Sequence, residues 1–313
     1  MPTIIAAIRR SSGNPGSSAV VVIVVCALAA ICTRARGQGQ LTEPIYRVAN
    51  ETAAAQPAAP LPAAAPAANA TPASRVVLDF TQQPGEHPLA PAIRVCKASL
   101  EEIDRNVRDY SCTLVKRERV DGELGEHQHI LLKVRHEPFS VYMNFLKPFQ
   151  GREVVYVDGQ NNNKLIVLEA GWKRVAGKLP LDPNGARAMN GQKHPITKVG
   201  IRNLTAALIR RMEADIKYSE CEVLTKDEKI GDRPATMVQV IHPIPRQNFD
   251  AHIARVFFDN ELGIPIHYDS FLWPQQQGGQ PPLDESFTYM NLKINNGFTP
   301  RDFDAYNNPE IFQ

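Results

Sequence analysis

The sequence has 313 residues, of which 43% are hydrophobic, and 35 Lys and Arg against 33 Asp and Glu give a formal net charge of +2. These values are typical of a globular protein. They exclude a collagen, a coiled-coil rod, a membrane protein with several spans and a basic nucleic-acid-binding protein. Proline is frequent, with 25 residues, and much of the proline and alanine lies in one stretch near the N-terminus. The whole-chain composition and charge therefore average over segments that differ in amino-acid composition.

The first 37 residues have the layout of a secretory signal. Arg9 and Arg10 precede a polar stretch, and residues 19–32 contain no charged side chain. Ala35 and Gly37 fit the −3 and −1 positions of a cleavage site. As a helix the apolar stretch would span about 21 Å, short of the ~30 Å hydrocarbon core. We interpret the segment as a cleaved signal peptide, with an uncleaved signal anchor as the alternative, and expect export to the periplasm or cell envelope.

Residues 38–88 are predicted to form a disordered linker. Between Ala53 and Ala73 there are twelve Ala and five Pro, and neither apolar periodicity nor an aromatic residue. Proline opposes helix formation and alanine buries too little surface to offset the loss of chain entropy. Without the signal and its four Arg, 31 basic and 33 acidic residues remain, a net charge of −2. A nucleic-acid partner is therefore not expected.

Residues 89–313 are predicted to form one domain, with 29 basic and 29 acidic residues. Two stretches, Pro91–Val107 and Gly200–Ile216, repeat apolar residues every three or four positions and are predicted as amphipathic helices. Their apolar faces carry Ile93, Cys96, Leu100, Ile103 and Val107 in the first, and Ile201, Leu204, Leu208 and Met212 in the second.

The rest of this domain alternates apolar and polar residues with a period of two, interrupted by turns such as Asp121-Gly122 and Gly231-Asp232. Short strands without helices between them form an antiparallel meander, which tends to curl. We predict an α+β fold: a strongly curved antiparallel sheet, or half-open barrel, whose concave face is covered by the N-terminal and mid-chain helices. The eleven predicted strands are 110–120, 126–136, 139–147, 152–158, 164–169, 172–176, 218–229, 233–242, 252–259, 264–273 and 284–294.

Catalytic motifs are missing from the sequence. His127 and His129 share one face of a predicted strand, but no further ligand follows at a spacing typical of metal sites, so we predict neither a metal nor a cofactor. His194 precedes the second helix without a nucleophile nearby in the sequence. The run Lys116–Arg119 has mixed charge and is interpreted as an exposed strand. The three cysteines after the signal, Cys96, Cys112 and Cys221, are expected to be mainly buried free thiols.

An apolar surface is the strongest candidate for binding. Two adjacent predicted strands and the second helix would place many apolar side chains on the concave face. Met and Phe adapt well to a lipid chain. The alternative is a solid core without a pocket. The candidate ligand-binding residues are Ile130, Leu132, Val134, Phe139, Val141, Met143, Phe145, Leu204, Leu208 and Met212.

Several strings resemble a planctomycete-type family of proteins of unknown function, DUF1571, over residues 89–312. They include Phe139–Met143, Lys147–Val154 and His194–Thr197. The order of elements is in turn similar to the lipoprotein-carrier fold of LolA, LolB and RseB. That resemblance implies a half-open barrel whose apolar interior shelters acyl chains or, in RseB, a fold that grips partner proteins.

The expected function is that of an exported, non-enzymatic envelope protein that binds or carries a lipid or a lipoprotein acyl chain. A protein-interaction or sensing module for an envelope partner is the alternative, and an enzyme with an unrecognised site is the third reading. Membrane contact is expected only through the N-terminal signal or anchor.

Overall fold

A computed structural model describes residues 76–218 and 220–312. The predicted signal and the alanine- and proline-rich part of the predicted linker lie outside these residues. The linker prediction was wrong at its C-terminal end, because residues 76–88 pack against the domain. The Phe80 ring lies 5.6 Å from the ring of Phe258, and Val76 is buried beside Gly263. A short apolar pattern, Val76, Leu78 and Phe80, is the sequence signal for this contact.

Both predicted helices are present. They are α1 (Ala90–Asn106) and α3 (Ile201–Asp215), and most of their predicted apolar faces are buried. Shorter helices are α2 (Ala186–Met189) and the 3₁₀ turns η1 (Asn161–Asn163), η2 (Gly171–Ala176), η3 (Ile196–Lys198) and η4 (Pro300–Phe303). Among the described residues, no helix has both the length and the apolar character needed to cross a bilayer.

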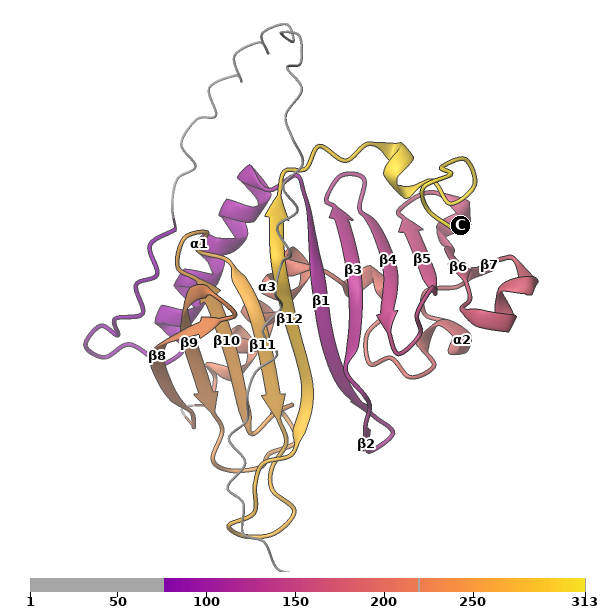
Figure 1. Cartoon of the computed structure of the whole chain (residues 1–313). Coiled ribbons are helices and arrows are strands. Elements are labelled where there is room, and N and C mark those ends of the chain that lie inside the picture. Colours follow the sequence, from indigo (N-terminus) through magenta and orange to yellow (C-terminus); the bar gives the residue numbers. More distant parts are fainter. Residues whose placement is uncertain (1–75, 219, 313) are drawn as a thin grey trace, which may run out of the picture. The chain divides into compact units, whose positions relative to one another are not determined.

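Twelve strands form one antiparallel sheet that does not close into a barrel (Figure 1). Its order is β7-β6-β5-β4-β3-β1-β12-β11-β10-β9-β8, with β2 paired to β1. The first and last long strands thus pair at the centre of the sheet. The bounds are β1 Asp109–Val120, β2 Glu123–Leu124, β3 Gln128–Arg135, β4 Ser140–Lys147, β5 Glu153–Val157, β6 Leu165–Leu168, β7 Lys178–Leu181, β8 Glu222–Ile230, β9 Arg233–Ile241, β10 Ile253–Asp259, β11 Pro265–Phe271 and β12 Leu283–Ile294.

The strand predicted at 172–176 is wrong, because those residues form the 3₁₀ helix η2. Gly171, the first residue of η2, and Gly177, which follows it, have φ values of 58° and 67°, which turn the chain out of the extended conformation at both ends. The strand beside β6 is instead β7, in a segment that lies outside the predicted strands. The strand predicted at 218–229 begins later, at Glu222.

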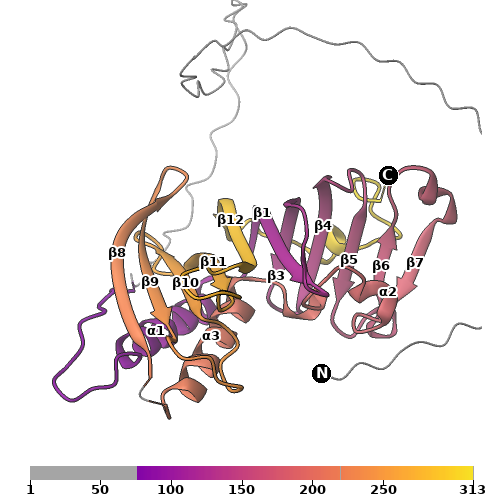
Figure 2. The ribbon, with the colours of Figure 1, turned by 90° about the horizontal axis from the view of Figure 1, so that it is seen from below.

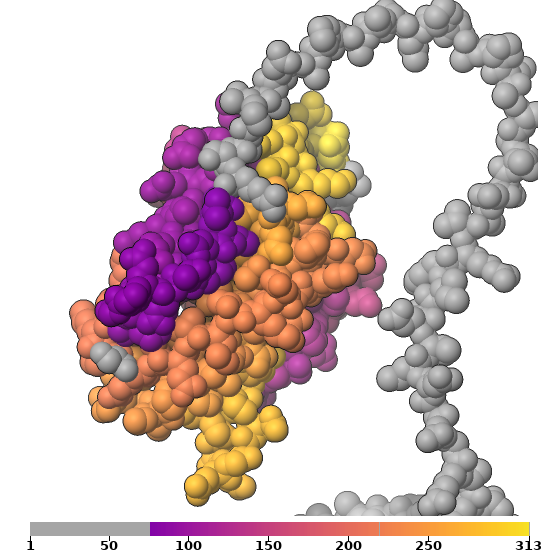
Figure 3. All heavy atoms as spheres, turned by 90° about the vertical axis from the view of Figure 1, so that its left-hand side faces the viewer, coloured from indigo at the N-terminus to yellow at the C-terminus, as the bar shows by residue number. Residues whose placement is uncertain are grey.

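Helices α1 and α3 lie side by side on the concave face of the sheet, under β8 to β11 (Figure 2). The space-filling view shows the indigo residues of α1 lying directly against the orange C-terminal strands (Figure 3). This arrangement confirms the predicted fold class. The cluster consists of Leu89, Ala92, Ile93, Val95 and Cys96 from the α1 region, Leu208, Ile209 and Met212 from α3, and Val238, Val240, Val256 and Phe258 from the sheet.

The C-terminal segment covers the opposite, convex face of β4 to β6 (Figure 1). Phe303, Ile311 and Phe312 pack there against alternate side chains of these strands, including Val155 and Ile166. Strands β4 to β6 are therefore buried on both faces, which explains their nearly unbroken apolar sequence. All three described cysteines are free thiols, with Cys96 and Cys112 buried and Cys221 half-buried, as expected.

Replacing Phe80 by Ala tests whether residues 76–88 belong to the folded domain. The substitution removes a half-buried ring from the cluster around Phe258 and should lower the free energy of unfolding by about 1.5 kcal/mol. Urea denaturation of the purified chain measures this loss. Val77→Ala is the matched control, since Val77 is 78% exposed and its truncation should leave stability unchanged. Equal midpoints for both variants would contradict the packing.

Candidate functional site

An irregular stretch covers the half of the concave face that the long helices leave free. We call residues 182–199 the cover segment. It leaves the edge strand β7 and ends at α3, where it reaches the central strands β1 and β12. It therefore passes across β3 to β6, and its residues Ala188, Ile196 and Val199 belong to or pack against the apolar cluster to which these strands contribute.

At the end of the cover segment, two glutamates face each other across the central strand pair. Glu118 of β1 and Glu285 of β12 are direct cross-strand partners. Like charges directly opposite each other destabilise a sheet. Glu118 is only 6% exposed, so water does little to screen this repulsion. The pair requires nearby positive charge.

Two lysines supply that charge, one from the sheet and one from the cover segment. Lys116 donates hydrogen bonds to Glu118 at 2.9 Å and to Gln192 at 2.5 Å. Lys193 pairs with Asp284 and lies 3.9 Å from Glu285. Because Gln192 and Lys193 belong to the cover segment, these bonds fasten it to the sheet. We call this group of side chains the latch.

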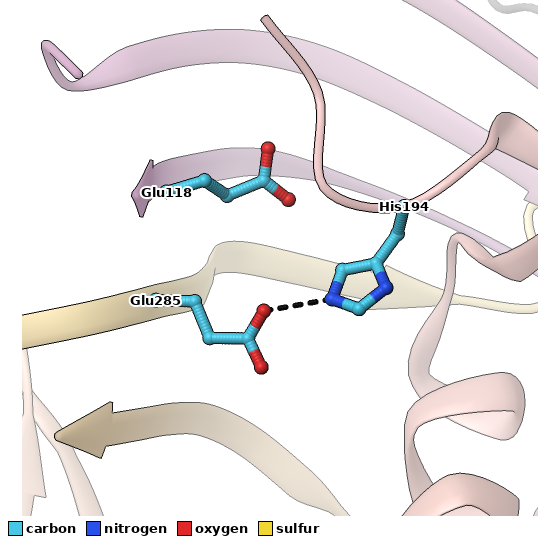
Figure 4. Close-up of side chains that lie close together, drawn as sticks. All are labelled: Glu118, His194 and Glu285. Carbon is cyan, nitrogen blue, oxygen red and sulfur yellow. Dashed lines mark hydrogen bonds and ion pairs between the residues drawn. The ribbon is translucent and has the colours of Figure 1, made fainter. Parts of the chain in front are cut away.

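His194 completes the latch from the same segment. Its Nε2 atom lies 2.7 Å from a carboxylate oxygen of Glu285, and the two side chains point toward each other in Figure 4. The hydrogen bond to Glu285 and the negative charges of Glu285 and Glu118 raise the pKa of His194. The contact thus favours the protonated ring, so the latch is strongest at mildly acidic pH.

The latch residues also have a donor set suited to a divalent cation. One atom each from Glu118, His194 and Glu285 lies within 4.8 Å of the others. Carboxylate oxygen and imidazole nitrogen are ordinary ligands of Zn²⁺ and Mn²⁺. However, the two carboxylates already have ammonium groups as partners, Lys116 beside Glu118 and Lys193 beside Glu285. We therefore interpret the group as a latch between two parts of the chain.

A glycine marks the point where the cover segment joins α3. Gly200 has φ 113° and ψ 156°, a conformation that only glycine adopts readily. A Cβ atom at this position would lie 2.9 Å from the hydroxyl of Tyr110. That hydroxyl accepts a hydrogen bond from the backbone N–H of Ile201 at 3.0 Å. The buried Tyr110 thus fixes the start of α3 on the sheet.

The structure divides the ten predicted ligand-binding residues between two clusters. Those of β3 and β4, with Phe139, lie under the cover segment, and Leu208 and Met212 pack against α1 and the sheet. Leu204 contacts both clusters. Phe139 and Leu204 are half-buried and the other eight are buried: Ile130, Leu132, Val134, Val141, Met143, Phe145, Leu208 and Met212.

A small apolar gap lies on the concave side of the sheet, and a larger groove lies on the convex face. The enclosed gap between α1, the start of α3 and the sheet, beside Tyr110 and Ile201, has no room for a water molecule. A groove of about 430 Å³ lies instead on the convex face, beside the C-terminal segment. Its lining residues are Ser111, Cys112, Thr113, Leu131, Leu132, Lys133, Tyr142, Asn144, Asn291, Lys293, Glu310 and Ile311.

Sequence reasoning missed most of the latch. Lys116 and Glu118 were interpreted as exposed, but both are buried because they continue the inward-facing alternation of β1. That alternation, from Tyr110 onward, was the available signal. Glu285 carries no such signal, since only the β1–β12 register brings it opposite Glu118. Neither His127 nor His129 belongs to the cluster.

The comparisons with known proteins give a family and several distant structures. The model of the family of proteins of unknown function DUF1571 matches residues 107–312. No curated protein matches.

Three solved structures illustrate the similarity. The lipoprotein LppX of Mycobacterium tuberculosis is 14% identical, with 69% of this chain and 100% of that chain covered and a TM-score of 0.36. A putative outer membrane lipoprotein-sorting protein domain from Vibrio parahaemolyticus is 12% identical, with 68% and 96% covered and a TM-score of 0.33. A DUF1329 family protein from Desulfovibrio piger is 8% identical, with 72% and 99% covered and a TM-score of 0.35.

The pKa of His194 tests the latch directly. In the parent protein it should lie above the ordinary value of about 6.5, and Glu285→Gln should return it toward that value. Because the folded-state pKa is raised, the stabilisation is complete below the unfolded-state pKa and is lost as pH rises through the folded-state value. NMR titration of the histidine ring signals measures the pKa of His194 in the parent and in the variant. Glu101→Gln, an exposed change on α1, is the control, and an equal pKa in all three proteins would contradict the latch.

Proposed function

The chain belongs to the DUF1571 family of proteins of unknown function, and we propose that it binds and carries an apolar ligand of the cell envelope. The ligand is a lipid or a lipoprotein acyl chain, and no chemical step is involved. Export is part of the proposal and rests on the signal predicted in residues 1–37.

This proposal rests on a difference between the two halves of the concave face, one covered by α1 and α3 and the other by the cover segment. Under β8 to β11, two long helices bury a dense apolar cluster. Under β3 to β6, the cover segment contributes only Pro183 and Ile196 as buried side chains before Gly200. Burial of one Ile is worth about 1.5–3 kcal/mol, so this cover is weakly held by apolar contact. The hydrogen bonds and ion pairs of the latch therefore contribute much of the attachment of the cover segment to the sheet.

An acyl chain can replace such a cover. Displacing the cover segment would uncover Ile130, Met143 and Phe145 on β3 and β4. Exposure of this surface to water is costly, but a ligand that takes the place of the segment keeps it dry. Each buried methylene contributes about 0.8 kcal/mol, so a long acyl chain can offset the lost contacts of Ile196. The eight predicted residues of this cluster are the proposed contact surface, whereas Leu208 and Met212 remain packed between α1 and the sheet.

The latch would then control access. It joins Gln192, Lys193 and His194 to the central strands, at the end of the cover segment that adjoins Gly200. Releasing these bonds would free the segment and leave α1 and α3 in place, because most of their buried apolar side chains pack in the other cluster. Weakening the latch should therefore ease ligand entry and leave the rest of the fold intact.

Native mass spectrometry with palmitic acid as the probe tests the carrier function. The full chain should bind one acyl chain, and Glu285→Gln should bind it about fivefold faster, as expected for the loss of about 1 kcal/mol of latch bonding. Glu101→Gln is the control and should behave like the parent. If neither the parent nor the latch variant takes up palmitic acid or co-purifies with lipid from an envelope fraction, the carrier proposal fails.

The convex groove favours a second candidate, a protein-interaction module. Leu131 is 44% exposed on its floor, between the polar side chains of Lys133 and Asn144. An open groove over strands, with mixed apolar and polar lining, fits an extended segment of another protein.

A photo-crosslinking residue at position 131 distinguishes this candidate. It should capture a defined protein from a delipidated envelope extract, whereas the same residue at Leu224, which is 52% exposed on β8, should not. Capture at neither position, or equally at both, would contradict the interaction module.

A further inference from the structure

The two most exposed large hydrophobic side chains of the described residues lie on one short helix. Trp172 is 82% exposed and Val175 is 88% exposed, and both belong to η2 between β6 and β7. In a 3₁₀ helix, residues three apart lie on the same face. Figure 1 places β6 and β7 at the right-hand end of the sheet, so this apolar pair lies at one extremity of it.

The neighbouring hairpin adds further exposed apolar surface. Leu146 and Phe149, at the end of β4 and in the turn that follows, are each 38% exposed. The guanidinium group of Arg174 in η2 donates a hydrogen bond to the carbonyl of Gly151 at 3.1 Å. Arg152 pairs with Glu169, just before η2, at 2.9 Å. These bonds hold η2 and the hairpin together. We call residues 146–152 and 171–176 the end patch.

The end patch carries a net positive charge. Arg152 and Arg174 are matched by Glu169 and Glu153. Lys147 and Lys173 are exposed and have no ion-pair partner in the part of the chain that the structure describes. Counting four basic against two acidic side chains, the net charge is +2. Two unpaired ammonium groups therefore flank the apolar side chains.

We infer that the end patch docks on the surface of an anionic lipid bilayer. Trp is enriched at the membrane interface, where its ring sits at the level of the lipid headgroups. Unpaired lysines beside it gain attraction from anionic headgroups. Lysine is depleted in protein–protein interfaces, which makes a protein partner a poorer match for this combination of side chains. The sequence prediction placed membrane contact only at the N-terminal signal, and the end patch adds a second contact within the domain.

The end patch is continuous with the concave face. The Phe149 ring lies 6.3 Å from the ring of Phe145, and Phe145 is buried under the cover segment. An apolar path thus leads from the docked surface to the proposed ligand site. Docking itself requires no ligand, so it can be tested whether or not the carrier proposal holds.

Fluorescence of Trp172 tests the docking. The full chain has two tryptophans, Trp172 and Trp273, and the second is half-buried with its indole N–H bonded to the carbonyl of His242. The difference between the fluorescence spectra of the parent and of Trp172→Phe therefore reports on Trp172 alone, even where the N-terminal segment also binds lipid. With vesicles of phosphatidylcholine and phosphatidylglycerol, this signal should shift to the blue and be quenched by brominated acyl chains. Vesicles of phosphatidylcholine alone should give a much weaker change.

Charge and apolar variants complete the test. Lys147→Gln and Lys173→Gln should each raise the lipid concentration for half-maximal shift about fivefold, and Val175→Ser should also weaken binding. Leu224→Ser, a change at an exposed apolar residue of the opposite edge strand β8, is the control and should have no effect. The inference would be overturned if the blue shift and the quenching are absent, or if Leu224→Ser weakens lipid binding as much as the end-patch variants do. Circular dichroism confirms that each variant is folded.

Discussion

The pairing of β1 with β12 is the constraint on which the rest of the structure depends. It joins the first and last long strands at the centre of the sheet and places Glu118 directly opposite Glu285. Two ionised carboxylates that face each other in a poorly hydrated position repel each other strongly, and nearby positive charge offsets this repulsion. Lys116 supplies part of it from the sheet, and Lys193 and His194 bring the rest from the cover segment. The electrostatic need of the central strand pair therefore holds the cover over the apolar concave face.

The two halves of the concave face consequently differ in kind. One half is a conventional core in which α1 and α3 interlock with β8 to β11. The other is closed by a segment with little apolar surface of its own and with charged contacts at one end. Hydrophobic burial is strong and insensitive to pH, whereas the latch includes a histidine whose protonation changes near neutral pH. A stable domain with one separately held cover is the feature on which the proposed uptake of an apolar molecule rests.

Local patterns predicted much of the fold. The 3.6-residue periodicity placed both long helices within one or two residues of their observed bounds, and alternation placed ten of the eleven predicted strands. The exception, 172–176, shows the limit of local propensity. Trp, Val and two flanking glycines fit a short strand, but no neighbour pairs with these residues, and the positive φ of Gly171 and Gly177 turns them into η2. The packing of Phe80 was missed because Val76, Leu78 and Phe80 form only a short alternation, which directly follows a stretch of disordered-type composition.

The sequence by itself determined the fold class, the apolar faces of the helices and strands, and the residues that line the concave side, because these depend on the local period of hydrophobicity. Only the tertiary structure decided which side chains form the latch and the end patch. Glu118 and His194 are far apart in the chain, as are Phe149 and Trp172, and the sheet order and register bring each pair to one place. The tertiary structure also decided how tightly α1, the start of α3 and the sheet pack beside Tyr110, because packing depends on how side-chain volumes fit together and not on their hydrophobicity.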